Sequence, residues 1–260
     1  MDFAGALASK KIYDLGQPMF TGMPHHPAHP PYLYSLNKLH GEFVYDNGAS
    51  SSSETITLGG HVGTHIDALA HFTCDGKLHG GMPPTQSYGG GVKEHSADTI
   101  GPIARRAVLY DVARMMNVDV LPRDFEVTPE HLESFKLEPL AGGIALIRTG
   151  FASYWSDPKQ FLTGGKGAVV SGPGPSDRAA HWLSARGIFA AGSDTIAFEL
   201  APSAMNVHVH LIVERGIHII ECLDLEEIAR DGVREFTFVA LPLKIRGGTG
   251  SPIRPIGILD

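Results

Sequence analysis

The feature that most constrains this chain is a run of four potential metal ligands or proton carriers within eleven residues. They are His61, His65, Asp67 and His71, and glycines and other small residues surround them. Two imidazoles and one carboxylate form a donor set that suits zinc, manganese or ferrous iron. An extended strand would separate His61 from Asp67 by about 20 Å at ~3.3 Å per residue, which is too far for one ion. In a regular helix, Asp67 would lie off the face that His61 and His65 share.

Three of these side chains can therefore bind one ion only if the chain bends between them. Gly59, Gly60 and Gly63 permit such a bend, because glycine tolerates backbone conformations that other residues avoid. Just upstream, residues 54–58 (ETITL) alternate like a half-buried strand. The sequence thus predicts a strand that bends at its C-terminal end and carries a metal site there. An HxxxH pair alone is common, whereas HxGTHxD in a glycine-rich bend is far more specific.

The rest of the chain predicts a mixed α/β domain. Strands are predicted from short apolar or alternating runs, at residues 11–15, 107–112, 143–148, 188–192, 217–220, 235–243 and 253–259. Helices are predicted where a capping residue or a terminating glycine frames a segment, at residues 131–135, 176–183 and 206–214. There is no internal repeat and no low-complexity linker, so we expect one domain over residues 1–260.

Composition limits the classes of partner. Lys and Arg total 21 against 28 Asp and Glu, a net charge of −7 without a basic block, so neither nucleic acid nor an anionic membrane surface is expected. The sequence contains no run of ~18 consecutive apolar residues, so a transmembrane helix is not expected. Residues 1–11 do not resemble a secretory signal. Two cysteines, Cys74 and Cys222, cannot form a disulfide framework, so we expect a cytoplasmic protein.

One further segment bears on the site. Residues 23–32 (MPHHPAHPPY) predict an irregular loop that crosses the surface or covers a site. A second metal site formed by His25, His26 and His29 is less favoured than a loop that covers the substrate, and a plain surface loop is favoured over both. A catalytic thiol at Cys74 is also disfavoured, since no base-and-nucleophile pattern surrounds it. Without a GxSxG motif, a serine-hydrolase triad is not expected either.

The segment from His61 to Phe72, HVGTHIDALAHF, resembles the HxGTHxDAPxHF signature of the cyclase-like metal-dependent hydrolases. That group includes the bacterial kynurenine formamidases and the isatin hydrolases. Leu69 stands where the signature has proline. The similarity extends to residues 176–194, 207–212, 219–221, 241–244 and 248–254. The last of these blocks, GTGSPIR, is especially close to the isatin hydrolases.

The resemblance implies a swivelling β/α/β fold and a homodimer or higher homo-oligomer that acts on a small-molecule substrate. It implies that His61, His65 and Asp67 are metal ligands and that His71 transfers protons. For the second half of the chain it leaves alternatives open. The formamidases hold two zinc ions with a further histidine and glutamate, which map onto His208 and Glu221.

The isatin-hydrolase pattern instead implies a site for a single manganese ion, with a carboxamide as an extra ligand. The corresponding region here is residues 194–199, where Glu199 is the one carboxylate besides Asp194. The predicted cofactor is therefore Mn²⁺ or Zn²⁺, and Glu199 joins His208 and Glu221 as a candidate ligand.

These residues together predict a metal-dependent hydrolase of an amide, either a cyclic amide such as isatin or an N-formyl aromatic amine. The metal would lower the pKa of a bound water and polarise the carbonyl, while His71 takes the proton and returns it to the leaving nitrogen. Two alternatives stay open: a cyclase, dehydratase or lactone hydrolase that uses the same site, and a non-catalytic protein that binds metal or small molecules. An intact His71 favours catalysis, because metal storage does not require a proton carrier.

Overall fold

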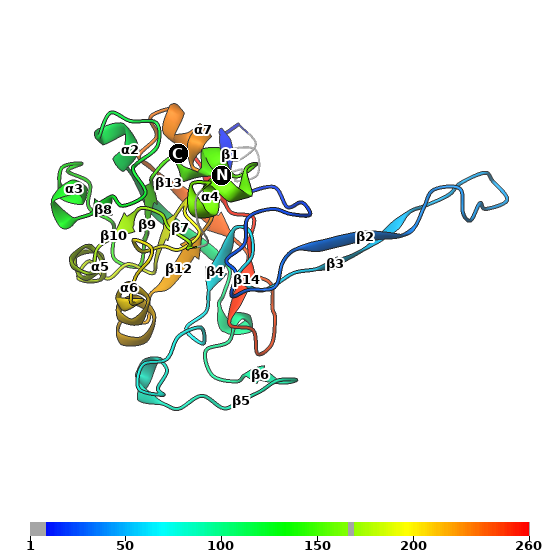
Figure 1. The fold of residues 1–260 in the computed structure, drawn as a ribbon, viewed down its shortest axis with the longest axis horizontal. Helices are drawn as coiled ribbons and strands as arrows, with labels where there is room; N and C mark the ends of the chain where they lie inside the picture. The colour runs from blue at the N-terminus through cyan, green and yellow to red at the C-terminus, as the bar shows by residue number, and fades with distance from the viewer. Residues whose placement is uncertain (1–8, 166–168, 260) are drawn as a thin grey trace.

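The computed structural model describes residues 9–165 and 169–259. Its central parallel strands come from the apolar runs in the middle of the chain: β7 (Ile103–Asp111), β9 (Ile144–Arg148), β11 (Ala190–Ser193) and β12 (His218–Glu221). Antiparallel strands extend them on both sides: β1 (Ile12–Asp14), β4 (His65–Asp67), β13 (Glu235–Ala240), β14 (Gly250–Pro252) and β15 (Ile256–Ile258). They form one nine-stranded sheet in the order β1-β15-β13-β7-β9-β11-β12-β4-β14 (Figure 1).

Helices lie between the parallel strands and at their ends: α2 (Val112–Met115), α3 (Pro129–Glu133), α4 (Pro158–Thr163), α5 (Asp177–Ser184), α6 (Asn206–His208) and α7 (Glu226–Arg230). Short 3₁₀ turns add η1 (His79–Gly81), η2 (Ala97–Thr99) and η3 (Phe151–Tyr154). The Ser176 hydroxyl caps α5 by accepting from the Ala179 N–H, and Gly187 follows the helix with a φ of +64°, as predicted. The helix predicted at 206–214 is α6 continued by a π-helical segment, η4 (Val209–Glu214).

Both faces of the sheet are buried around its centre, which explains the continuous apolar runs within its central strands. Along β7, Ala107 and Leu109 belong to one hydrophobic cluster, whereas Val108 and Tyr110 belong to another. The second cluster also contains Leu183 of α5. The mixed α/β fold predicted from the sequence is confirmed.

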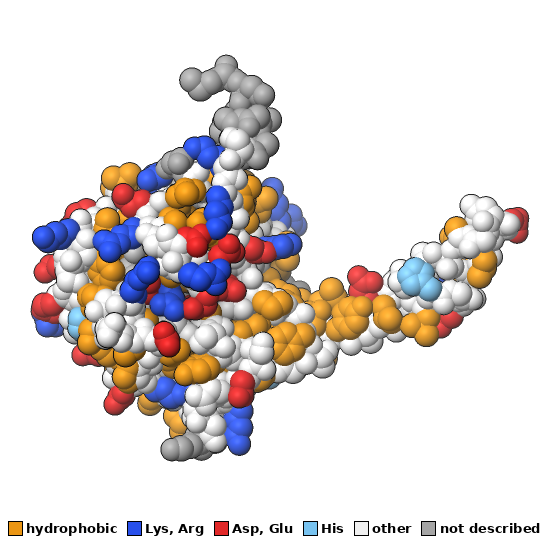
Figure 2. Space-filling model, turned by 90° about the horizontal axis from the view of Figure 1, so that it is seen from above, with side chains coloured by type: hydrophobic (Ala, Val, Ile, Leu, Met, Phe, Trp, Pro, Cys, Tyr) orange, Lys and Arg blue, Asp and Glu red, His pale blue; other side chains and the backbone are white. Residues whose placement is uncertain are grey.

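Three small sheets lie outside the main one. They are β2 (Leu33–Lys38) with β3 (Ser53–Thr57), β5 (Gln86–Ser87) with β6 (Gly91–Val92), and β8 (Glu126–Val127) with β10 (Gly174–Pro175). The β2–β3 hairpin, residues 33–57, projects far from the body, and we call it the arm (Figures 1 and 2). The half-buried strand predicted at 54–58 is therefore wrong in its burial: it is β3 of the arm, and most of its residues are exposed. The apolar side of this strand contains Ile56, which lies opposite Tyr34 of β2 and is about half exposed.

Some predicted strand limits also change. The strand predicted at 235–243 ends at Ala240, and the one at 253–259 shortens to β15. The sequence did not predict β14, which pairs with β4. In the described part of the chain, no helix is long and apolar enough to cross a membrane.

Candidate metal centre

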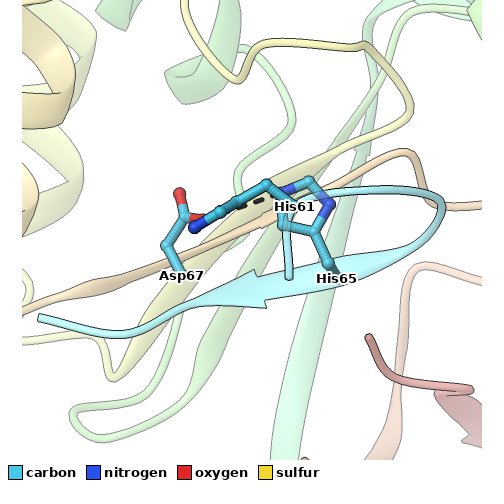
Figure 3. Close-up of side chains that lie close together, drawn as sticks. All are labelled: His61, His65 and Asp67. Carbon is cyan, nitrogen blue, oxygen red and sulfur yellow. Dashed lines mark hydrogen bonds and ion pairs between the residues drawn. The ribbon is translucent and has the colours of Figure 1, made fainter. Parts of the chain in front are cut away.

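The chain turns sharply between β3 and β4, and this turn brings the first three predicted ligands together. Gly63 has a φ of +72°, a left-handed conformation that favours glycine. At Gly60, an added Cβ would lie 2.9 Å from a backbone carbonyl oxygen of β14. His65 and Asp67 are alternate residues of β4 and so lie on one face of the strand. His61 returns from the turn to meet them, so the predicted bend is present (Figure 3).

Hydrogen bonds orient both imidazoles. His65 Nδ1 donates to the Gly63 carbonyl oxygen at 2.8 Å, so the lone pair of the neutral ring lies on Nε2. His61 Nδ1 lies 2.7 Å from Asp67 Oδ1, and its Nε2 lies 2.9 Å from Thr249 Oγ1. His65 Nε2 is 3.6 Å from the same Asp67 oxygen. Both imidazoles therefore approach one buried carboxylate.

Two predicted ligands from the second half of the chain lie beside this group. Antiparallel pairing of β12 with β4 places Glu221 opposite His65. Glu221 Oε2 lies 3.5 Å from His65 Nε2, and its Oε1 lies 3.3 Å from His208 Nε2. Donor atoms of His61, His65 and Asp67 lie within 4.8 Å of one another, and so do those of Asp67, His208 and Glu221. The fold thus gathers predicted ligands from both halves of the chain in one buried cluster.

Glu199 contacts this cluster only through His208. Its Oε1 lies 3.5 Å from His208 Nδ1. Its two carboxylate oxygens accept hydrogen bonds from the Ser203 hydroxyl and the Val207 N–H, both at 2.7 Å. This geometry favours a role in orienting His208, and a direct role of Glu199 as a metal ligand stays a prediction.

The donor set fits a divalent cation. Three buried polar atoms in the cluster have no hydrogen-bond partner among the described residues: His65 Nε2, Asp67 Oδ2 and His208 Nδ1. Leaving a buried donor or acceptor unsatisfied costs about 1–3 kcal/mol per group. Imidazole nitrogens and carboxylate oxygens are the ligands that zinc and manganese accept in proteins.

The electrostatics of the cluster also suit a cation. Burial alone would lower the pKa of His208, but the close contacts with the carboxylates of Glu199 and Glu221 and the nearby charge of Asp67 raise it to about 10. Burial alone would raise the pKa of Asp67, but the charges and hydrogen bond of His71 and His61 hold it well below its ordinary value. The carboxylates therefore dominate the local field, and a positive charge is stabilised there.

His71 lies against this cluster. Its ring stacks on that of His61, with centroids 3.9 Å apart. Burial, together with repulsion from neighbouring histidines, lowers the pKa of His71 to about 3, although Asp67 opposes the shift. The ring is therefore neutral near pH 7. Leu69, in place of the signature proline, leaves the turn formed: the His71 N–H still donates to the Ala68 carbonyl oxygen at 2.9 Å.

A cavity of about 560 Å³ opens above the cluster. Its polar floor contains His61, His71, His208 and Glu221. Apolar side chains form much of its wall, namely Phe72, Val169, Val170, Ile196 and Met205. The histidine- and proline-rich loop lines it too, and His29 stacks on His61 at 5.0 Å between ring centroids. Residues 26–29 line the cavity, so of the two alternatives predicted for residues 23–32 this geometry favours the loop that covers a site.

Comparison with known proteins identifies the family. The Cyclase family model matches residues 13–200. The chain belongs to the cyclase family. A kynurenine formamidase of Bacillus cereus is 28% identical over 246 residues, which are 94% of this chain and 95% of that protein.

Solved structures are similar along nearly the whole chain. One described as a novel cyclase has a TM-score of 0.85 at 28% identity and covers 98% of this chain and 89% of its own. Isatin hydrolase A from Ralstonia solanacearum has a TM-score of 0.76 at 25% identity and covers 100% of this chain and 98% of its own.

Sequence reasoning missed two neighbours of His61. Thr249 contacts one of its ring nitrogens, and an added Cβ at Gly250 would lie 2.5 Å from its Cε1. Both residues belong to the GTGSPIR block, whose similarity to the isatin hydrolases is the signal that could have found them. The ligand roles predicted for the cluster and the proton-transfer role of His71 stay predictions.

Proposed function

We propose that this cyclase-family chain is a metal-dependent hydrolase of a small non-peptide amide, with His71 as the proton carrier. The substrate is a cyclic amide such as isatin or an N-formyl aromatic amine. The observation that carries the proposal is the group of unsatisfied buried ligand atoms in the cluster, whose members His61, His208 and Glu221 line one cavity together with His71. The relatives named as kynurenine formamidase and isatin hydrolase support the amide class.

His61, His65 and Asp67 hold the cation, and His208 and Glu221 complete the site or hold a second ion. When bound, Zn²⁺ or Mn²⁺ supplies Lewis acidity that polarises a carbonyl and acidifies water. Thr249 and the Gly63 carbonyl oxygen orient the imidazoles, as partners of ligating histidines commonly do.

His71 moves the proton. As a neutral imidazole it accepts a proton from the attacking water while the water oxygen bonds to the carbonyl carbon. When the C–N bond breaks, the protonated ring returns that proton to the leaving nitrogen. Stacking of His71 on His61 keeps the ring next to the metal ligands during both transfers.

The cavity wall supports an aromatic substrate. Phe72, Ile196 and Met205 offer apolar surface directly beside the polar floor. A flat apolar ring with one amide group matches this division, because the ring is removed from water while the amide reaches the donor atoms. The loop that carries His29 lines the same cavity and would limit the access of water to it.

A substrate panel tests the proposal. Protein loaded separately with Mn²⁺ and Zn²⁺ is assayed on isatin, N-formyl aromatic amines, aromatic lactones and hydroxy acids. We expect turnover of at least one amide and none by an Asp67→Asn variant. Preferential turnover of a lactone or hydroxy acid would contradict the amide class, and metal binding without turnover of any member would indicate a binding protein.

A cytoplasmic location is part of this proposal. Both cysteines are unpaired thiols, Cys74 exposed and Cys222 buried. Free thiols are typical of reducing compartments. Fractionation of cells that express the natural gene, followed by immunoblotting, checks the location.

A further inference from the structure

A second group of potential metal ligands lies outside the candidate metal centre, where α5 packs beside the α6–η4 segment (Figure 1). It consists of His181 on α5 and of His210 and Glu214 on η4, and we call it the surface group. One ligand atom from each residue lies within 4.8 Å of the other two. Two imidazoles and one carboxylate are also the protein ligands of known zinc sites. The surface group shares no residue with the candidate metal centre, so an ion bound here would be a separate one.

The three side chains are already close together. The rings of His181 and His210 are stacked, with centroids 3.7 Å apart and ring planes inclined by 17°. His210 Nδ1 lies 2.7 Å from Glu214 Oε2, four residues further along η4. Zinc bonds of about 2.0–2.2 Å in a tetrahedron place the ligand atoms roughly 3–4 Å from one another. Small side-chain rotations are therefore enough for all three residues to reach one ion.

Hydrogen bonds orient the buried member of the surface group, His210. The Ser184 hydroxyl donates to the His181 carbonyl oxygen at 3.0 Å, so its oxygen accepts from His210 Nε2 at 2.8 Å. The lone pair of the neutral His210 ring then lies on Nδ1, the atom that faces Glu214. Two acceptor atoms 2.7 Å apart repel each other, so a cation, either a proton or a metal ion, must lie between them.

The exposed members of the surface group leave room for such an ion. His181 Nδ1 donates to the Asp177 carbonyl oxygen at 2.9 Å, so the lone pair of its neutral ring lies on Nε2. The side chains of His181 and Glu214 are 56% and 57% exposed, whereas that of His210 is 7% exposed. An ion held by all three residues would therefore still contact solvent. A water molecule can then supply the fourth ligand of a tetrahedral zinc ion.

We propose that His181, His210 and Glu214 bind a Zn²⁺ ion at the surface, and that this ion fastens α5 to η4. His208 lies two residues before His210 and lines the cavity above the candidate metal centre, whereas His210 contacts Ser184 of α5. One short segment thus carries a predicted ligand of the candidate metal centre and a ligand of the surface zinc. Fastening η4 to α5 restrains the backbone that positions His208. Zinc binding by the surface group does not depend on the proposed hydrolase activity.

Zinc content after equilibrium dialysis against Zn²⁺ tests the site. His181→Ala is expected to hold one equivalent fewer than the unaltered protein, and Ser184→Ala to bind that equivalent about 10–100-fold more weakly. Arg178→Ala is the matched control, because Arg178 is an exposed residue of the same helix that pairs with Glu130. The same difference of one equivalent is expected in an Asp67→Asn background, which separates this ion from the candidate metal centre. Equal zinc content in His181→Ala and unaltered protein would overturn the proposal.

Chemical modification locates the ion without any substitution. Diethyl pyrocarbonate modifies accessible imidazoles at the lone pair, and mass spectrometry of peptides follows each histidine separately. Free Zn²⁺ at ten times the dissociation constant occupies about nine-tenths of the sites, so His181 should react about 10-fold more slowly. His40, an exposed histidine of the arm, is the internal control and should react at an unchanged rate. Mg²⁺, which prefers oxygen ligands, should protect neither residue. Unchanged reactivity of His181 in Zn²⁺, or equal slowing of His40, would refute the site.

Thermal unfolding tests whether the ion fastens the two elements. An ion that binds only the folded chain at 100 times its dissociation constant raises the Tm by roughly 5–11 °C for a chain of this size. We expect this rise when Zn²⁺ is added to Asp67→Asn protein, and a rise smaller by that amount in the Asp67→Asn/His181→Ala protein. An equal rise in both proteins would contradict the fastening role.

Discussion

The close approach of Gly250 to His61 allows a sharp prediction. In Gly250→Ala, the new Cβ would lie 2.5 Å from His61 Cε1, 2.8 Å from Nδ1 and 2.9 Å from Nε2. Carbon atoms in contact are normally about 3.5–4 Å apart, so the ring must move by roughly 1 Å. Asp67 and Thr249 hold the two ring nitrogens at 2.7 and 2.9 Å, so this movement breaks at least one of those contacts.

The size of the effect follows from that displacement. Misplacing a catalytic group by about 1 Å costs on the order of 100-fold in rate. Losing the partner of a metal-bound histidine typically weakens metal affinity by about 10–100-fold. Overpacking costs about 1–3 kcal/mol of stability, which lowers the Tm by roughly 2–12 °C at about 2–4 °C per kcal/mol. Gly250→Ala should therefore remain folded at 25 °C while losing metal and activity.

The assay separates these effects. Metal content is measured by elemental analysis after gel filtration, kcat/KM with the best amide of the panel, and folding by circular dichroism. Gly101→Ala is the matched control, because its added Cβ meets no atom within 4 Å. A Gly250→Ala protein that keeps full metal content and unchanged kcat/KM would refute the placement of His61 in the metal site.

Other residues give further expectations. His71→Asn should lose about 10²–10⁴-fold in kcat and keep its metal, and a loss below about threefold would exclude His71 as the proton carrier. Asp67→Asn should reduce the metal content measured by elemental analysis, because it removes the carboxylate shared by both donor groups. A thiol reagent should titrate Cys74 in the native protein and Cys222 only after unfolding, since Cys222 is buried. Finally, burial and neighbouring histidines lower the pKa of His71 to about 3 and that of His29 to about 4, from 6.5. The unfolded chain therefore takes up these protons first, so the Tm of the metal-free protein should fall as the pH drops from 6.5 towards 4, and less steeply in His71→Asn.

Local sequence patterns predicted the centre of the fold well, for identifiable reasons. Both faces of the sheet are covered at β7 and β9, so side chains on both sides of these strands are apolar. The result is a continuous apolar run in the sequence, which is easily recognised. Ser176 and Gly187 frame α5 through contacts within a few residues. The π-helical form of residues 209–214 could not be predicted, because it differs from an α-helix in hydrogen-bond register and not in side-chain pattern.

In the candidate site, too, contacts between residues close in sequence were predictable and contacts between distant residues were not. His61, His65 and Asp67 lie within one short segment, so spacing and glycines alone predicted that they meet. Glu221 reaches them through the pairing of β12 with β4, a contact between residues more than 150 positions apart. No local pattern encodes such a pairing, so only the family resemblance pointed to Glu221. Gly250 was missed for a related reason: its importance lies in the absence of a side chain where His61 approaches.

The arm shows where pattern reading fails and what the failure means. Alternation along 54–58 correctly predicts a strand with one apolar side, since Ile56 lies opposite Tyr34 in the register with β2. Alternation reports only that an apolar side exists, and it does not say which surface covers that side. The structure places no other part of the described chain over Tyr34 and Ile56, which remain about half exposed. The exposure of this apolar side is therefore a property of the tertiary structure, and the local pattern could not predict it.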